Sequence, residues 1–182
     1  EKYSNQRFVA NQIWRLEHGQ AQVPSHDTIQ MISAGRYGSF LVSDLSADRF
    51  RQITFRVLIP PGAIFNFVYN YLSLNQWRAA RVEGRERADA LGKDSGLIVC
   101  WQWPAWANSG RYKISSEPDP RRRQHDIQLV LDPPGNFNMT VNGVLLDLDA
   151  GVSWGFDPKG RIGFFTELGL VSVVDLEVHR AS

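Results

Sequence analysis

Three of the six tryptophans in the chain lie close together in the segment CWQWPAWANSGRY, residues 100–112. An indole ring stacks on flat apolar surfaces, and neighbouring amides, guanidinium groups and carboxylates can form paired hydrogen bonds. A sugar ring presents both kinds of surface, because C–H groups line its faces and hydroxyls line its edge. Trp101, Trp103 and Trp106 are therefore candidate stacking partners for a sugar. The alternative is that Trp101 and Trp103 belong to the core, since large aromatic side chains are usually buried, and that only Trp106 lies on a loop.

Hydrolysis of a glycosidic bond needs two carboxyl groups that face the same bond, about 5 Å or 6.5–9.5 Å apart. The candidate acid in this sequence is Glu83. Glu86 follows three positions later, so strand alternation puts the two carboxylates on opposite faces if the strand continues. An ion pair of Glu83 with Arg81 or Arg85 is the alternative interpretation.

The sequence predicts no metal site and no cofactor. The histidines show no metal-ligand spacing. Asp147 and Asp149 share a strand face, but two carboxylates are too few for a calcium site. Phosphate loops, Gly-x-Ser-x-Gly motifs and dinucleotide fingerprints are absent from the sequence. Cys100 is the only cysteine, so no intramolecular disulfide can form.

Length and composition indicate one globular domain over residues 1–182, with 43% hydrophobic and 21% charged residues. The formal net charge of +1 is too small to predict nucleic-acid binding. No segment approaches the ~20 apolar residues of a membrane-spanning helix, and we expect no membrane partner. Binding to a partner protein is compatible with this composition.

Apolar and polar residues alternate along most of the chain with a period of two, which is typical of half-buried strands. Turn signals separate these segments, among them PPG at 60–62, NG at 142–143 and DPKG at 157–160. About ten to twelve strands at such regular spacing predict a β-sandwich or barrel, with at most one or two short helices. A single helical turn can form around Glu86–Leu91, between Gly84 and Gly92. The predicted strands cover residues 14–23, 28–33, 39–45, 51–59, 63–74, 76–84, 96–103, 125–132, 137–148, 161–167 and 170–180.

The order of these elements and three motifs near the end, MTVNGVLL, GRIGFF and VSVVDLEVHR, resemble the concanavalin A-like lectin/glucanase superfamily. The likeness is closest to its laminin-G-like and three-keto-disaccharide-hydrolase-like domains. The resemblance implies an all-β, two-sheet antiparallel jelly-roll sandwich in which sugars commonly bind the concave outer face of one sheet. It also favours a secreted or periplasmic protein. The glucanases of the superfamily carry a Glu-x-Asp-x-x-Glu pattern on one strand, and this sequence does not contain it.

Alternation predicts which side chains face outward from the sheets. In residues 63–72, the Phe65, Phe67, Tyr69 and Tyr71 set is the expected core face, so Asn66 and Asn70 point outward. Arg81 and Glu83 also face outward, because unpaired charges are costly to bury. In residues 97–103 both alternating sets are apolar. If Ile98 and Cys100 face inward, Trp101 and Trp103 share the outer face with those polar residues.

Three functions remain open: a non-catalytic lectin-like or carbohydrate-binding domain, a glycoside hydrolase-like enzyme with Glu83 among its acids, and a structural or protein-interaction module. We take the first as the leading hypothesis. Arg111 follows Trp106 in a predicted loop, where both can form the rim of a site. The predicted ligand-binding residues are Asn66, Asn70, Arg81, Glu83, Trp101, Trp103, Trp106 and Arg111.

Overall fold

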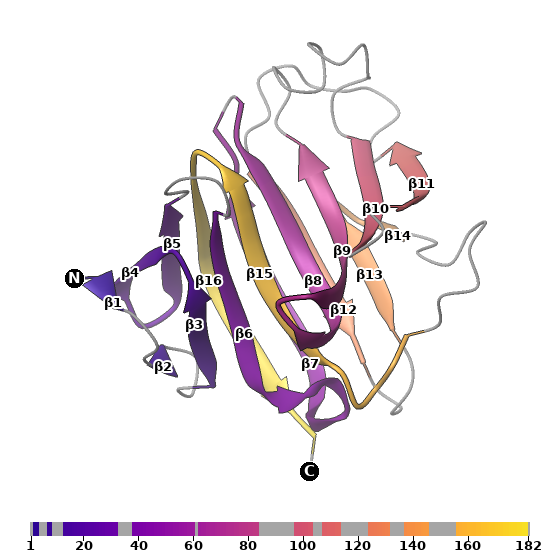
Figure 1. The fold of residues 1–182 in the computed structure, drawn as a ribbon, viewed down its shortest axis with the longest axis horizontal. Helices are drawn as coiled ribbons and strands as arrows, with labels where there is room; N and C mark the ends of the chain where they lie inside the picture. Colours follow the sequence, from indigo (N-terminus) through magenta and orange to yellow (C-terminus); the bar gives the residue numbers. More distant parts are fainter. Residues whose placement is uncertain are drawn as a thin grey trace.

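The computed structural model shows a sandwich of two eight-stranded antiparallel sheets, which overlap in the view of Figure 1. This confirms the all-β jelly-roll architecture that the sequence predicts. No helix in the part of the chain that the structure describes is long and apolar enough to span a bilayer. The structure describes residues 2–3, 7–8, 13–32, 38–60, 62–83, 97–103, 107–113, 124–131, 137–145 and 156–181.

The two sheets draw their strands from both halves of the chain. In spatial order, the first sheet contains β1 (Lys2–Tyr3), β4 (Gln20–Ser25), β5 (Thr28–Ile32), β16 (Leu170–Arg180), β7 (Phe50–Leu58), β12 (Gln124–Val130), β13 (Asn138–Val141) and β14 (Val144–Leu145). The second contains β11 (Ala107–Lys113), β10 (Leu97–Trp103), β9 (Gln76–Glu83), β8 (Ile64–Ser73), β15 (Arg161–Leu168), β6 (Ser39–Ser46), β3 (Trp14–His18) and β2 (Arg7–Phe8).

Most predicted strands are confirmed to within a few residues. The segment predicted over residues 137–148 divides into β13 and β14, and β1 and β2 were not predicted. The segment predicted as one strand over residues 14–23 divides at Gly19 into β3 and β4, which belong to different sheets. Residues 107–113, predicted as a loop, form β11, which pairs with β10. Among the described residues, the only helix is a 3₁₀ turn, η1 (Ala47–Arg49). The helical turn predicted near Glu86–Leu91 and the pair Asp147 and Asp149 lie outside the described residues.

Side chains from the facing sides of both sheets form the core between them. Phe164 of β15 is its aromatic centre, and it is fully buried. Its ring centroid lies 4.8 Å from that of Trp14, 5.2 Å from that of Phe55 and 6.1 Å from that of Phe65. Phe65, Phe67 and Tyr69 all belong to this core, so these three residues define the inner face of β8.

Two residues with left-handed backbone reverse the expected alternation within strands. Asn70 has φ +51°, and the register of β8 with β9 shifts beyond Tyr69. As a result, Tyr71 joins a separate cluster on the opposite face of the sheet, so its assignment to the core face was wrong. Along residues 170–180 the alternation of apolar and polar residues slips, which predicts a bulge near Val173–Val174. In β16, Asp175 has φ +52° at a register shift against β7, which confirms this bulge.

Candidate functional site

An aromatic cluster lies on the outer face of the second sheet, the face turned away from the first sheet. Phe40, Tyr71, Trp77 and Phe165 form this outer aromatic cluster, whose apolar neighbours include Val68 and Ala79. The ring centroid of Phe40 lies 5.6 Å from that of Tyr71, 5.4 Å from that of Trp77 and 5.0 Å from that of Phe165. All four rings are at most 7% exposed, so they provide packing rather than a free stacking surface.

Charges border this cluster at Tyr71. The guanidinium carbon of Arg161 lies 5.0 Å from the centroid of the Tyr71 ring, within the range of a cation–π contact. Burial raises the pKa of Tyr71 to about 12, and the negative charge of Glu17 acts in the same direction. The phenol therefore stays protonated at neutral pH and is not available as a base.

Asn66 lies on the same outer face as the aromatic cluster, as alternation predicts, but its side chain is fully buried. Its Nδ2 donates a long hydrogen bond of 3.4 Å to the carbonyl oxygen of Phe165. Its Oδ1 is buried and accepts no hydrogen bond. An unsatisfied buried acceptor of this kind costs about 1–3 kcal/mol of folding stability, so packing alone does not explain why an asparagine occupies this position.

The pairing register identifies the residues that share the outer face from β8 to β11, at the edge of the sheet. Asn66 pairs with Arg81, Arg81 with Val99, and Val99 with Arg111. These residues occupy neighbouring positions in one row across β8, β9, β10 and β11. Cross-strand partners share a face of the sheet, so Arg81 and Arg111 hold outer-face positions.

The same register answers which positions of β10 face the core. Cys100 pairs with Ala80, which belongs to the core, whereas Trp101 pairs with Ala79 of the outer cluster. Trp103 pairs with Trp77, another member of that cluster. Both tryptophans therefore stand at outer-face positions.

The remaining predicted site residues divide into three groups. Glu83 pairs with Ile64, two positions before Asn66 on β8, and so shares the outer-face register. Arg111 lies in an edge strand rather than in a loop, because pairing with β10 extends the sheet by one strand. Trp106 lies outside the described residues.

Asn70 has a structural contact instead of the outward position that alternation predicts. It sits at the bulge of β8, where its left-handed backbone interrupts the register. Its Oδ1 accepts a hydrogen bond of 2.7 Å from the backbone N–H of Asp157 and so holds the turn that precedes β15. Sequence reasoning missed the outer aromatic cluster, although Trp77 and Phe165 each fall on the side of their strand opposite the core.

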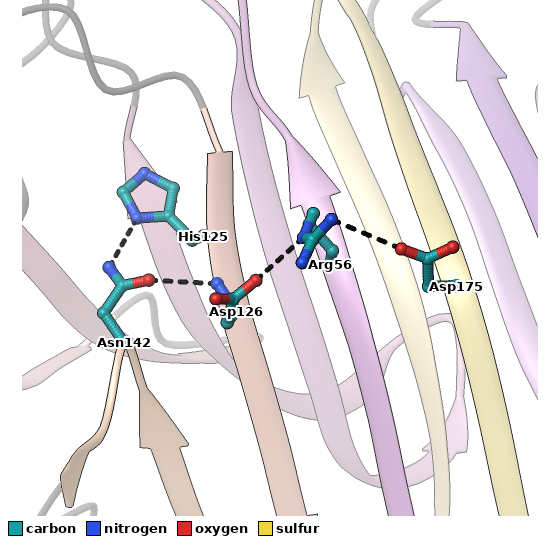
Figure 2. A network of polar contacts seen from close by, with 5 residues as sticks. All are labelled: Arg56, His125, Asp126, Asn142 and Asp175. Atoms are coloured by element: carbon teal, nitrogen blue, oxygen red, sulfur yellow. Dashed lines mark hydrogen bonds and ion pairs between the residues drawn. The ribbon is translucent and has the colours of Figure 1, made fainter.

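A polar network in the first sheet, drawn in Figure 2 and absent from the sequence-based predictions, joins the outer-face residues Arg56, Asp126 and Asp175 to Asn142 and to the buried His125. The Arg56 guanidinium donates to Asp126 at 2.9 Å and reaches Asp175 at 3.4 Å. Two side-chain hydrogen bonds of Asn142 tie the hairpin turn to β12. The Asn142 Oδ1 accepts from the backbone N–H of Asp126 at 3.0 Å, and its Nδ2 lies 3.0 Å from the His125 Nδ1.

Arg56, Asp126 and Asp175 of this network line a shallow depression of about 390 Å³. The Asp126 and Asp175 side chains are 61% and 66% exposed, so water screens their ion pairs with Arg56. The charges are already paired within the sheet, and the described lining contains no aromatic ring other than that of Phe55, which is buried. We therefore assign this network to linking the strands of the first sheet and not to binding a sugar.

Replacing Asn142 with alanine is expected to lower the free energy of unfolding by about 2 kcal/mol. Asn142 and Gly143 have φ of +53° and +81°, which confirms the tight hairpin turn predicted from the sequence. Alanine in left-handed backbone costs about 1–2 kcal/mol, and both side-chain hydrogen bonds of the turn are lost. Chemical denaturation measures the change. Asn142→Gly is the control, since it keeps the backbone geometry and should lose only the hydrogen bonds; equal losses for the two variants would contradict the argument.

Among the described residues, no group of three or more His, Cys, Asp or Glu side chains is arranged to hold a metal ion. The strongest candidate site is thus the outer face of the second sheet from β8 to β11, where two tryptophan positions lie beside a row containing two arginines and an asparagine.

Solved structures with the same fold include proteins that bind or cleave carbohydrates. The chain is similar to the carbohydrate-binding module CBM66 from Bacillus subtilis, at 15% identity and a TM-score of 0.62 with all of both chains covered. It is similar to a protein of unknown function with a galectin-like fold from Bacillus subtilis, at 13% identity and a TM-score of 0.65, covering 99% of this chain and 97% of that one. A β-glucanase from Bacillus licheniformis matches at 10% identity and a TM-score of 0.60, covering 100% and 98%.

These likenesses show that the chain shares its fold with these proteins, which is the fold that the resemblance implies. The sequence itself matches no family model and no curated relative. One fold thus hosts both binding modules and hydrolases, and the residues of the site must distinguish between them.

Proposed function

We propose that this chain is a non-catalytic carbohydrate-binding domain that binds sugar on the outer face of the second sheet, over β9, β10 and β11. The observation that carries the proposal is the register of Trp101 with Ala79 and of Trp103 with Trp77. Two indoles at successive outer positions of one strand would form a stacking platform for sugar rings. The arginine row next to them supplies donors for hydroxyl groups.

The burial of the described side chains argues against a site over the middle of this face. The outer aromatic cluster on β6, β8, β9 and β15 is almost closed to solvent. Residues there cannot stack on a sugar without rearrangement. This leaves the strands nearest the β11 edge as the part of the face where a ligand would bind.

The same positions argue against hydrolysis as the leading function. On β9, β10 and β11 the outer-face register contains one carboxylic acid, Glu83, and glycosidases use a pair. Turnover of a polysaccharide panel, with loss of that turnover in Glu83→Gln, would establish the hydrolase alternative instead. Unchanged sugar binding by Glu83→Gln without any turnover supports the binding domain.

Replacing Trp103 or Trp101 with alanine is expected to raise the Kd for a bound oligosaccharide about tenfold. A stacking contact is worth about 0.5–1.5 kcal/mol, and 1.4 kcal/mol corresponds to a factor of ten. The measurement is isothermal titration calorimetry against oligosaccharides selected from a glycan array. Both variants should retain cooperative melting, because their positions face away from the core.

Trp14→Phe is the matched control, since Trp14 is fully buried between the sheets. This change should lower the melting temperature and leave the Kd unchanged. The proposal fails if no glycan binds the unmodified protein. It also fails if Trp101→Ala and Trp103→Ala bind sugar as the unmodified protein does.

A further inference from the structure

We propose that the first sheet carries a binding site for a phosphate or sulfate group, at the end where β16 finishes beside the start of β7 (Figure 1). A hollow of about 440 Å³ lies there, lined by Arg51, Gln52, Val178, His179 and Arg180. The proposed sugar-binding face belongs to the other sheet. This second site therefore goes beyond the proposed function and does not depend on it.

A break in the pairing of β7 with β16 brings these side chains together. His179 pairs with Gln52, but Arg180 pairs with Phe50, so the register passes over Arg51. A bulge of this kind sets two residues of one strand opposite one residue of its partner and redirects their side chains. Consecutive residues of both strands therefore line a single hollow.

Three of the lining side chains have polar groups that the described structure does not use. Gln52 is half-buried and Arg180 is exposed, and neither side chain makes a hydrogen bond or an ion pair with any described residue. The ring of His179 is held at Nε2, which lies 2.8 Å from Oε1 of Glu177, and its Nδ1 contacts no described partner. A guanidinium can donate two parallel hydrogen bonds to one phosphate or sulfate, and amide and imidazole N–H groups can donate to its other oxygens.

Three exposed arginines come together at this end of the sheet. Arg51 and Arg180 line the hollow. Arg49 lies beside the end of β16, because its carbonyl oxygen accepts a hydrogen bond of 2.9 Å from the backbone N–H of Ala181. An anion bound in the hollow would lower the repulsion among these like charges.

The described carboxylates nearest in sequence to the lining residues already have partners. Glu177 is 2.8 Å from His179, Asp48 is 2.7 Å from Lys159, and Asp175 is 3.4 Å from Arg56. None of these three acids neutralises Arg180. The lining also contains no tryptophan, tyrosine or phenylalanine on which a sugar could stack, so its chemistry suits a charged group.

The test is a titration of the unmodified protein with inorganic phosphate and, separately, with inorganic sulfate. Sodium chloride at the same ionic strength is the reference for general salt effects. Two-dimensional NMR follows the backbone amides of residues 51–52 and 178–180 and yields the Kd. We expect phosphate or sulfate, but not chloride, to shift these amides to saturation, and the tighter of the two identifies the group that the site takes.

Arg180→Gln is expected to raise this Kd about tenfold, because hydrogen bonds between charged groups contribute enough free energy for such a factor. Gln52→Glu keeps both lining arginines but places a carboxylate in the hollow, and it should abolish saturable binding. Both positions lie outside the core, so both variants should melt cooperatively.

Arg56→Gln is the matched control, since it removes the same charge from β7 at a position outside the hollow. It should leave the Kd unchanged. The site is ruled out if phosphate and sulfate act on these amides only as chloride does. It is also ruled out if Arg180→Gln keeps the original Kd, or if Arg56→Gln weakens binding as much as Arg180→Gln. Sugar binding by the second sheet is measured separately, and its success or failure changes none of these outcomes.

Discussion

Replacing Phe164 with alanine is expected to lower the free energy of unfolding by about 3–5 kcal/mol. The ring of Phe164 is fully buried, and it contacts Trp14 from β3, Phe55 from β7 and Phe65 from β8. Because these partners come from both sheets, the cavity left by the ring cannot close without moving one sheet toward the other. In a chain of this size the loss corresponds to a fall in melting temperature of roughly 6–20 °C.

Leu72→Ala is the control for loss of an apolar side chain from a strand. Leu72 is 54% exposed, and its truncation should change the free energy of unfolding by no more than about 0.5 kcal/mol. Thermal and chemical denaturation of the two variants measure the contrast. If Phe164→Ala unfolded within experimental error of Leu72→Ala, the ring would not be central to the packing between the sheets.

Alternation predicts the strands well because most of this chain places one strand face in a single core. It fails at Tyr71, where the left-handed Asn70 inserts a bulge and exchanges the two faces of β8. Asparagine tolerates such a backbone, but nothing in a strand-like segment marks which asparagine adopts it. A turn with Asn-Gly at its centre is recognisable, since both of its positions need positive φ.

β11 was missed for a different reason. Its sequence, ANSGRYK, is poor in the branched and aromatic residues that favour strands. Its hydrogen-bonding partner is β10. The hydrogen bonds that stabilise β11 therefore come from a neighbouring strand, and the local sequence of residues 107–113 does not reveal them.

The candidate site was predictable in its residue types but not in its geometry. Both alternating sets of β10 are apolar, so the facing of Trp101 and Trp103 follows only from pairing with Ala79 and Trp77 of β9. The burial of Asn66 was harder still to predict from the sequence. Asn66 occupies an outer-face position and is nevertheless fully buried, because exposure depends on what lies above a sheet as well as on which way a residue points.

The second large effect is expected from Gly163→Ala, which should lower the free energy of unfolding by about 3 kcal/mol or more. Gly163 lies in β15, in register with Val42 of β6 and Val68 of β8. A Cβ at this position would lie 2.1 Å from the carbonyl oxygen of Leu41, a backbone atom that no side-chain rotation can move away. Relief of this contact requires β6 and β15 to separate, which weakens the pairing at the centre of the second sheet.

Gly143→Ala separates this steric effect from the general cost of losing a glycine. Gly143 has φ +81° but nothing within 4 Å of an added Cβ, so alanine there should cost only the backbone strain of about 1–2 kcal/mol. Chemical denaturation of both variants gives the comparison. A Gly163→Ala protein as stable as Gly143→Ala would mean that the two strands can move apart at little cost. Val42 and Val68 also pack in the outer aromatic cluster beside the proposed site. Sugar binding by Gly163→Ala therefore measures whether the outer face of the second sheet needs close pairing of β6 and β15.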